Sequence, residues 1–280
     1  MRSLANQRIW SHLSIDQERR TTNRDVRESD PLLVETFREL VTVVARIANH
    51  NPDFSLFFRG QAEDHKIKSG ASSFYPTIYR SPEGSLLRSK LYRRFEKLRK
   101  CSALLVKKLE AKSFEGIEKL RKFPELQWSL LQHYEVCDTP LIDLTHSLRV
   151  AASFALQKAD REGFLFAFAL PHPQGTITYS TEDEMLNVRL LSASPYSALR
   201  PHFQEGYLVG SFPTHAEKKH YSLDLGVRLV AKLVIPKNGF WGNDFHAIPQ
   251  QALYPVNDDV KAICDEVKAI CDEVAAKYGA

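Results

Sequence analysis

Seven consecutive residues near the middle of the chain, 164–170, have no polar member (Phe-Leu-Phe-Ala-Phe-Ala-Leu). An apolar run of this length is typical of a strand that is covered on both faces. Such a strand lies inside a sheet, because an edge strand would expose part of the run. The run therefore predicts the central strand of a buried sheet.

Other segments supply further strands and the helices. Aromatic or β-branched runs predict strands, and apolar residues at helical spacing predict helices. The helix predicted first begins after Ser29-Asp30-Pro31 and ends near Asn49, since Pro31 suits a first helical position. Helices come early and strands late, without regular alternation, which favours an α+β fold with a central mixed or antiparallel sheet and N-terminal helices. The other predicted helices are 84–112, 125–134 and 147–156, and the other strands are 54–59, 139–145, 206–212 and 227–235.

The 280 residues are interpreted as an N-terminal extension (1–29), one α+β domain (30–257) with a helical insertion at about 84–134, and a C-terminal amphipathic helix (258–280). The last segment repeats Val-Lys-Ala-Ile-Cys-Asp-Glu at 260–266 and 267–273. An apolar stripe follows the repeat, formed by Val260, Ile263, Val267, Ile270 and Val274. The stripe can dock on the domain or pair with a second copy, and docking is favoured because two heptads are too few for an independent coiled coil.

Composition excludes several classes of protein. Hydrophobic residues make up 43 % and charged residues 26 %, as in an ordinary globular protein. No apolar run reaches the length of a membrane-spanning helix, and the first thirty residues contain no secretory apolar stretch. We therefore expect a cytoplasmic protein with no membrane contact. The net charge of +4 is too small to indicate nucleic-acid binding by itself.

Basic residues are nevertheless concentrated in one segment. Between Arg88 and Lys108 the chain has nine Lys and Arg residues and one acid, Glu96. This segment is either a solvated helix surface or a surface that contacts phosphate, RNA or an acidic partner.

The four cysteines lie far from zinc-binding spacing. Cys101, Cys137, Cys264 and Cys271 form no Cys-x-x-Cys pair and have no histidine at zinc-finger spacing. We expect free, partly buried thiols and no metal centre. Motifs of P-loop nucleotide hydrolases, dinucleotide-binding dehydrogenases, α/β-hydrolases and zinc proteases are also missing from the sequence.

The first of three candidate motifs is Phe57-Phe58-Arg59-Gly60-Gln61, in which a guanidinium follows an apolar strand. An arginine fork fits two phosphate oxygens at once. Gly60 would let a ligand approach the backbone closely. The alternative is that Arg59 pairs with a buried carboxylate such as Asp143.

The second motif runs from Gln132-His133-Tyr134 through 139–145 to the alanine-rich segment 151–155. Polar groups that could orient a ligand stand here beside apolar, core-building segments. Alternatively, Asp143 and Thr145 cap the following helix while His133 and Tyr134 satisfy each other in the core.

The third motif runs from Arg200 to Val209, and in it Gln204 and Glu205 stand just before a predicted strand, next to Gly206. A carboxylate there could hold a ribose hydroxyl and stabilise the positive charge that develops on the sugar as its base leaves. The alternative is a plain turn that leads into the strand.

In this order the segments resemble the FRG domain, a bacterial and phage-associated family named for its Phe-Arg-Gly motif. The family pattern is similar to Phe58 to Gln61, to Gln132 to Thr145 with the helix that follows, and to Gln204 to Leu208. The resemblance extends over about residues 30–260, into a tail around Tyr254. Glu135 stands where the family usually has glycine, and Leu144 replaces a common tryptophan.

The resemblance implies a core like that of arginine-type ADP-ribosyltransferases, with NAD as substrate. The catalytic residues would then be Arg59, which binds the NAD phosphates, and Glu205 or Gln204, which acts on the ribose. The resemblance implies that the NAD-binding residues are Phe58, Arg59, Gly60, Gln61, His133, Tyr134, Thr139, Asp143 and Thr145.

The function that follows is an NAD-dependent ADP-ribosyltransferase that acts as a bacterial toxin or phage-defence effector on a protein or nucleic acid, with a neutralising antitoxin as a further expected partner. Two alternatives stay open. One is a non-catalytic recognition module that binds a nucleotide or nucleic acid through Arg59 and the basic segment 88–108. The other is a glycohydrolase that only destroys NAD.

Overall fold

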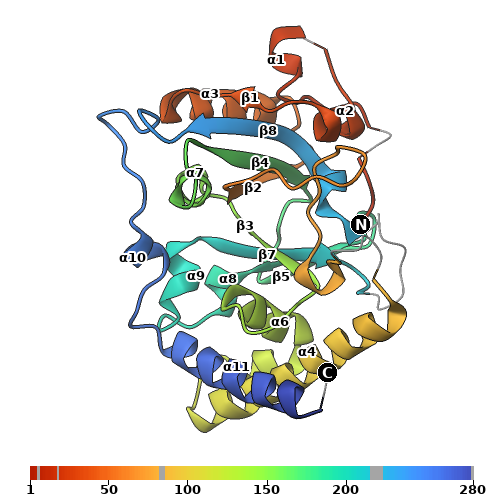
Figure 1. Ribbon diagram of the computed structural model, residues 1–280, viewed down its shortest axis with the longest axis vertical. Coiled ribbons are helices and arrows are strands. Elements are labelled where there is room, and N and C mark those ends of the chain that lie inside the picture. Colours follow the sequence, from red (N-terminus) through yellow and green to blue (C-terminus); the bar gives the residue numbers. More distant parts are fainter. Residues whose placement is uncertain (5–6, 18, 82–85, 215–222, 279–280) are drawn as a thin grey trace. The chain divides into compact units, whose positions relative to one another are not determined.

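The structure is a computed structural model that describes residues 1–4, 7–17, 19–81, 86–214 and 223–278 (Figure 1). Its helices are α1 (Ser14–Gln17), α2 (Asn23–Glu28), α3 (Phe37–Asn49), α4 (Arg88–Ala111), α5 (Ile117–Lys122), α6 (Pro124–His133), α7 (Leu148–Gln157), α8 (Leu190–Ala193), α9 (Leu199–Phe203), α10 (Gln250–Leu253) and α11 (Asp259–Tyr278), with 3-10 turns η1 (Thr77–Tyr79) and η3 (Leu225–Arg228). Its strands are β1 (Leu32–Leu33), β2 (Ser55–Gln61), β3 (Leu141–Thr145), β4 (Glu162–Leu170), β5 (Ile177–Ser180), β6 (Met185–Arg189), β7 (Gly206–Ser211) and β8 (Leu229–Pro236). Helices together with parallel and antiparallel strand pairs confirm the predicted α+β class with a mixed sheet.

The chain divides into two compact units, each built from segments that are far apart in sequence. The first unit comprises Met1–Phe74, Leu144–Pro173 and Asp224–Leu253. The second comprises Tyr75–Asp143, Gln174–Leu223 and Tyr254–Ala280. Strand β3 begins in the second unit and ends in the first.

In the first unit the strands follow the order β1-β8-β4-β2, and the end of β3 pairs with β2. The apolar run 164–170 forms most of β4, which is antiparallel to β8 on one side and to β2 on the other. Leu165, Phe166 and Phe168 are completely buried. The prediction of a central, doubly covered strand is confirmed.

The first predicted helix begins later than the sequence indicated. Leu32 and Leu33 form strand β1, parallel to β8, instead of the first helical turn after Pro31. Helix α3 begins at Phe37, where the Thr36 side chain accepts a hydrogen bond from the amide of Glu39. The prediction was wrong because pairing with β8, about two hundred residues away in sequence, outweighs the local helix signal of Pro31.

Two glycines let helix α7 lie against β2 and β4 (Figure 1). A Cβ atom built on Gly60 would overlap the carbonyl oxygen of Ala151 and come within 2.6 Å of the Ala155 amide nitrogen. A Cβ on Gly163 would come within 2.6 Å of the Ala155 carbonyl carbon. The small residues of the 151–155 segment and these glycines therefore serve one close helix-on-sheet contact.

In the second unit β5, β6 and β7 form an antiparallel ladder beside β3. Leu186, Val188 and Leu208 share a hydrophobic core with helices α4, α6 and α11. The sequence analysis missed the hairpin of β5 and β6, since β5 is a four-residue strand that is not buried and Asn187 interrupts the apolar residues of β6.

The C-terminal helix α11 packs along α4, as the docking interpretation predicted (Figure 1). Val260, Ile263 and Val267 are buried as expected. Ile270, however, is 39 % exposed, while Cys264 and Cys271 are buried instead. A straight helix has 3.6 residues per turn, so its buried face drifts away from a seven-residue stripe.

Candidate functional site

Arg59 lies on strand β2, in a row of side chains that crosses the sheet of the first unit. In register, Arg59 faces Phe166 of β4, and Phe166 faces Lys232 of β8. Cross-strand partners share one face of a sheet, and neighbouring residues along a strand alternate between faces. Arg59 is therefore on the face opposite to α7, whereas Gly60 is on the face that α7 covers. Phe58 is buried, and Arg59 and Gln61 are half-buried.

The contact at Gly60 corrects the expectation that this glycine admits a ligand. The space beside it is filled by the backbone of α7. Gly60 is needed because no side chain fits between β2 and the helix.

Thr145 directs the chain into α7. It is 5 % exposed, and its hydroxyl accepts a hydrogen bond from the Ser147 amide at 3.1 Å. The cap of α7 is the Ser147 side chain, which accepts from the Val150 amide at 3.4 Å. The alternative in which Thr145 supports the start of this helix is thus the closer description, although Ser147 forms the cap itself.

Asp143 joins helix α6 to strand β3 within the second unit. Its two carboxylate oxygens accept hydrogen bonds from Gln132 Nε2 at 2.9 Å and from His133 Nδ1 at 3.0 Å. Thr139, fully buried, donates to Gln132 Oε1 at 2.6 Å. Part of the second motif therefore forms one hydrogen-bonded cluster of Gln132, His133, Thr139 and Asp143, and Asp143 keeps a side-chain exposure of 34 %.

His133 contacts the third motif as well. Its side chain is 1 % exposed, and its Nε2 atom has no hydrogen-bond partner among the described residues. A Cβ on Gly206 would lie 3.2 Å from His133 Cε1. Gly206 thus makes room for the imidazole, and the structure brings the second and third motifs together at this point.

Tyr134 lies in the hydrophobic core of the second unit and not at its surface. It is 2 % exposed, and its hydroxyl donates to Asp258 Oδ2 at 2.8 Å. Burial, reinforced by the negative charge of Asp258, raises the pKa of Tyr134. Asp258 also caps α11 by accepting from the amides of Val260 and Lys261, both at 3.0 Å. The sequence analysis missed Asp258, although aspartate immediately before a helix is a typical N-cap.

Two glutamates in the motifs have left-handed backbone. Glu205 has a φ of 46° immediately before β7, and Glu135 has a φ of 57° after α6. Glu135 occupies the position where the resembled family has glycine, which adopts this conformation without strain. Its carboxylate binds the Arg200 guanidinium at 2.7 Å.

Glu205 differs from its neighbour Gln204. Gln204 is 6 % exposed, whereas Glu205 is exposed at the start of β7. Residues other than glycine in left-handed backbone cost free energy and cluster at functional sites. The geometry therefore presents a carboxylate to solvent on a strained backbone at the position singled out in the sequence.

The candidate residues are divided between the two units. Phe58, Arg59, Gly60, Gln61 and Thr145 belong to the first, and His133, Tyr134, Thr139, Asp143, Gln204 and Glu205 belong to the second.

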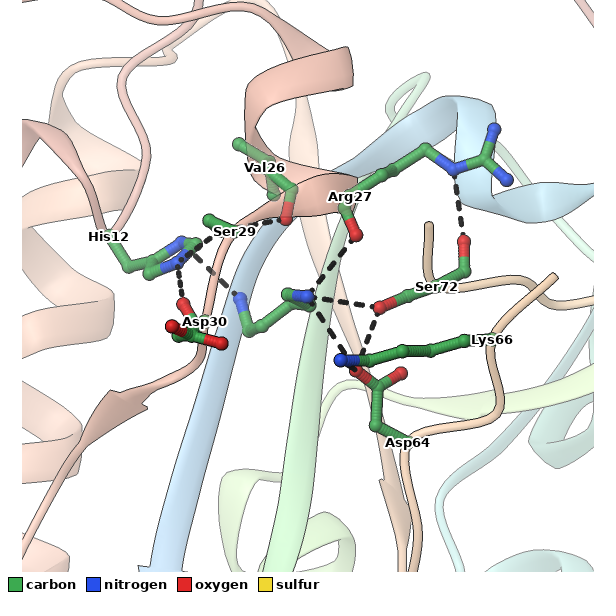
Figure 2. Close-up of polar contacts among 9 residues, drawn as sticks. His12, Val26, Arg27, Ser29, Asp30, Asp64, Lys66 and Ser72 are labelled. Atoms are coloured by element: carbon green, nitrogen blue, oxygen red, sulfur yellow. Dashed lines mark hydrogen bonds and ion pairs between the residues drawn. The ribbon is translucent and has the colours of Figure 1, made fainter. Parts of the chain in front are cut away.

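A buried polar cluster that the sequence did not indicate supports the loop after Gln61 (Figure 2). The Lys232 ammonium, with no exposed side-chain surface, lies 3.5 Å from Asp64 Oδ2 and 3.1 Å from Ser72 Oγ. Ser72 Oγ in turn donates to Asp64 at 2.9 Å. Burial lowers the pKa of Lys232. The cluster ties the loop to β8, two strands away from Arg59 in the sheet.

Among the described residues, no group of three or more His, Cys, Asp and Glu side chains is arranged to hold a metal ion. None of the helices in the described part of the chain combines the length and apolarity that a membrane crossing requires.

The first unit is thus an α+β arrangement in which β2 carries Arg59 and pairs with the central strand β4. Helix α7 packs closely on these two strands, and Gly60 and Gly163 make that contact possible. Residues 55–163 match the model of the FRG domain, which confirms the predicted resemblance over that segment. The match covers less than half of the chain, and the third motif lies outside it. Neither the curated proteins nor the solved structures contain a match to this chain.

Proposed function

We propose that this protein binds NAD and transfers its ADP-ribosyl group to a protein or nucleic acid, as a toxin or defence effector. The observation that carries the proposal is Glu205, an exposed carboxylate held in left-handed backbone directly before β7. Arg59, on the matched Phe-Arg-Gly strand, supplies the cation for the NAD phosphates.

In this reaction the bond between nicotinamide and ribose breaks, nicotinamide leaves with the bonding electrons, and the ribose carbon becomes positively charged. The Glu205 carboxylate stabilises that charge. An acceptor nucleophile then forms the new bond to the ribose and loses a proton. If water takes the place of the acceptor, the same chemistry yields free ADP-ribose, which is the glycohydrolase alternative.

The test uses NAD labelled on its adenylate, purified protein and a cell lysate. We expect nicotinamide release and labelled macromolecules from the wild type. Arg59→Ala is expected to weaken NAD binding by about tenfold to a hundredfold, because a charge-assisted phosphate contact is lost. Glu205→Gln is expected to slow nicotinamide release by about a hundredfold while NAD still binds. Arg59 and Glu205 are tested by separate variants because they belong to different units.

The structure offers a matched control for Glu205. Glu184 also has left-handed backbone, with a φ of 51°, and also directly precedes a strand, β6. Glu184→Gln is expected to leave nicotinamide release unchanged, as is Arg46→Ala on α3. Free ADP-ribose without labelled macromolecules would identify a hydrolase. Absence of both NAD binding and nicotinamide release would refute the proposal.

A second candidate function, recognition of a nucleic acid, is favoured by the outer face of α4. Arg94 donates to backbone carbonyls of η1, and Lys97 and Lys108 bind acids of α11. Arg93, Lys100 and Lys107 are exposed instead, and they recur every seven residues, on the side of α4 opposite to its buried leucines. A row of cations along one helix suits the regular negative charge of a phosphate backbone.

This candidate predicts salt-dependent binding of a short single-stranded RNA homopolymer. Changing Arg93, Lys100 and Lys107 together to Gln is expected to weaken binding at least about tenfold and to lower the slope of log affinity against log salt by about 2. Arg99→Gln is the control, since Arg99 binds Glu96 on the same helix. Equal binding by the triple variant and the wild type would contradict this candidate.

A further inference from the structure

Two buried cysteines meet where the C-terminal helix packs on α4. Cys101 Sγ of α4 and Cys271 Sγ of α11 lie 2.8 Å apart. Cys101 is 0 % exposed and Cys271 is 8 % exposed. Both residues belong to the second unit, so the contact depends on that unit alone.

The packing of the two helices holds these sulfurs in place. Lys97 binds Asp272 at 2.8 Å, and Lys108 binds Glu266 at 2.6 Å. Lys97 precedes Lys108 along α4, whereas its partner Asp272 follows Glu266 along α11. The two helices therefore run antiparallel. The ion pairs lie on both sides of Cys101 along α4 and align it with Cys271.

A third thiol gives this pair a route to solvent. Cys137 is half-buried, and its interaction with Cys101 raises the pKa of the Cys101 thiol. It also lines an open cavity of about 300 Å³ together with Lys97 and Asp272. A small oxidant can therefore reach Cys137 through the cavity, whereas Cys101 and Cys271 are buried and do not line it.

We propose that Cys101, Cys137 and Cys271 form an oxidation site at which peroxide produces a reversible disulfide between Cys101 and Cys271. This disulfide joins α4 covalently to α11. In a reducing compartment such a bond forms transiently, as in a redox-responsive site.

The steps balance as follows. Hydrogen peroxide oxidises the Cys137 thiol to a sulfenic acid and is itself reduced to water. The Cys101 thiol attacks the Cys137 sulfur, a second water leaves, and a Cys101–Cys137 disulfide forms. The Cys271 thiol then attacks Cys101 Sγ, and Cys137 leaves as a thiol. The net change is two thiols and one peroxide to one disulfide and two waters.

Burial explains why the reaction begins at Cys137. A hydrogen bond to Cys137 and burial raise the pKa of Cys101, and burial raises the pKa of Cys271 to about 12. The thiolate is the reactive form, so the two buried thiols react slowly with peroxide by themselves.

The internal repeat provides a control cysteine. Cys264 and Cys271 occupy the same position in the two copies of Val-Lys-Ala-Ile-Cys-Asp-Glu. Their local sequences therefore match, but it is the Cys271 thiol that Cys101 contacts. Any difference in oxidation between them reflects tertiary position rather than local sequence.

The experiment treats the full-length protein with hydrogen peroxide, blocks remaining thiols by alkylation, and maps disulfide-linked peptides by mass spectrometry without reduction. We expect one main linked pair, Cys101 with Cys271, which dithiothreitol removes. Cys271→Ser should abolish this pair, and Cys264→Ser should leave it unchanged. Cys137→Ser should slow its formation at least about tenfold, because the thiol that lines the cavity is lost.

The wild-type peptide map decides the proposal even if a variant folds poorly. A linked pair that includes Cys264, or no Cys101–Cys271 pair at any peroxide concentration that oxidises Cys137, would overturn it. Unchanged kinetics in Cys137→Ser would overturn the relay through Cys137. A second readout is protease cleavage within 259–278, which should be slower at least about tenfold in the oxidised protein, since the linked helix opens less often.

Discussion

Gly60→Ala is expected to destabilise the protein by more than about 3 kcal/mol and to prevent stable folding of the first unit. The added methyl group would overlap the Ala151 carbonyl oxygen and crowd the Ala155 amide. Both are backbone atoms of α7, so no side chain can rotate away to relieve the overlap. Overpacking of this kind forces the backbone to shift and lies at the costly end of core substitutions. Urea denaturation followed by circular dichroism measures the loss.

Two further variants separate this account from a ligand-binding role of Gly60. Gly175→Ala places its methyl group in open space, and we expect it to cost no more than about 1 kcal/mol for its left-handed backbone. Ala151→Gly should fail to rescue Gly60→Ala, since the overlapping atom is the carbonyl oxygen. A Gly60→Ala protein that is as stable as the wild type but has lost NAD binding would show that the ligand, not α7, requires the glycine.

Acid is expected to destabilise the first unit through His12. Burial and the positive charge of Lys232 lower the pKa of His12 from 6.5 to about 4 (Figure 2). The Lys232 amide donates to Nδ1 at 3.4 Å, and Nε2 donates to the Asp30 carbonyl at 3.1 Å. Both ring nitrogens are thus occupied in the neutral form, and protonation of Nδ1 would break the first of these bonds.

The sign of the effect follows from proton binding. Between pH 6.5 and pH 4 the unfolded chain carries the proton on His12 and the folded chain does not. Stability is therefore present above the unfolded pKa and decreases as the pH falls towards the folded value. The expected loss from this one residue is about 3 kcal/mol.

The measurement is the free energy of unfolding in urea at a series of pH values across this interval. His12→Gln is expected to be less stable at neutral pH, because it replaces a well-bonded ring, but to lose less stability on acidification. His50→Gln, which removes a histidine that bonds to the Arg46 carbonyl, should retain the wild-type slope. An unchanged slope in His12→Gln would contradict the assignment.

Much of the fold was predictable from local pattern. The apolar run of β4 and the spaced leucines of α4 could be predicted to be buried, because the pattern of apolar residues along a chain indicates which side chains face a core. The Phe-Arg-Gly motif was likewise visible in the sequence, and the family match over 55–163 agrees with it. The start of α3 was not predictable in this way, since β1 exists only through its pairing with β8.

The candidate site shows the same division. Its residue types were predictable because the Phe-Arg-Gly, Gln-His-Tyr and Gln-Glu-Gly motifs follow one another along the chain. The contacts of those residues were not. Tyr134 bonds to Asp258, which follows it by 124 positions, and Lys232 meets Asp64 from a distant strand. No local pattern reports partners at such separations.

The sequence by itself determined the fold class, the main helices and strands and the Phe-Arg-Gly motif, because each depends on residues that are near one another along the chain. Tertiary structure alone decided that Gly60 accommodates a helix, that Glu205 is exposed with left-handed backbone before β7, and that Cys271 rather than Cys264 meets Cys101. The physical reason is that close packing and burial are properties of atoms brought together by folding, and identical local sequences acquire different chemistry when their neighbours differ.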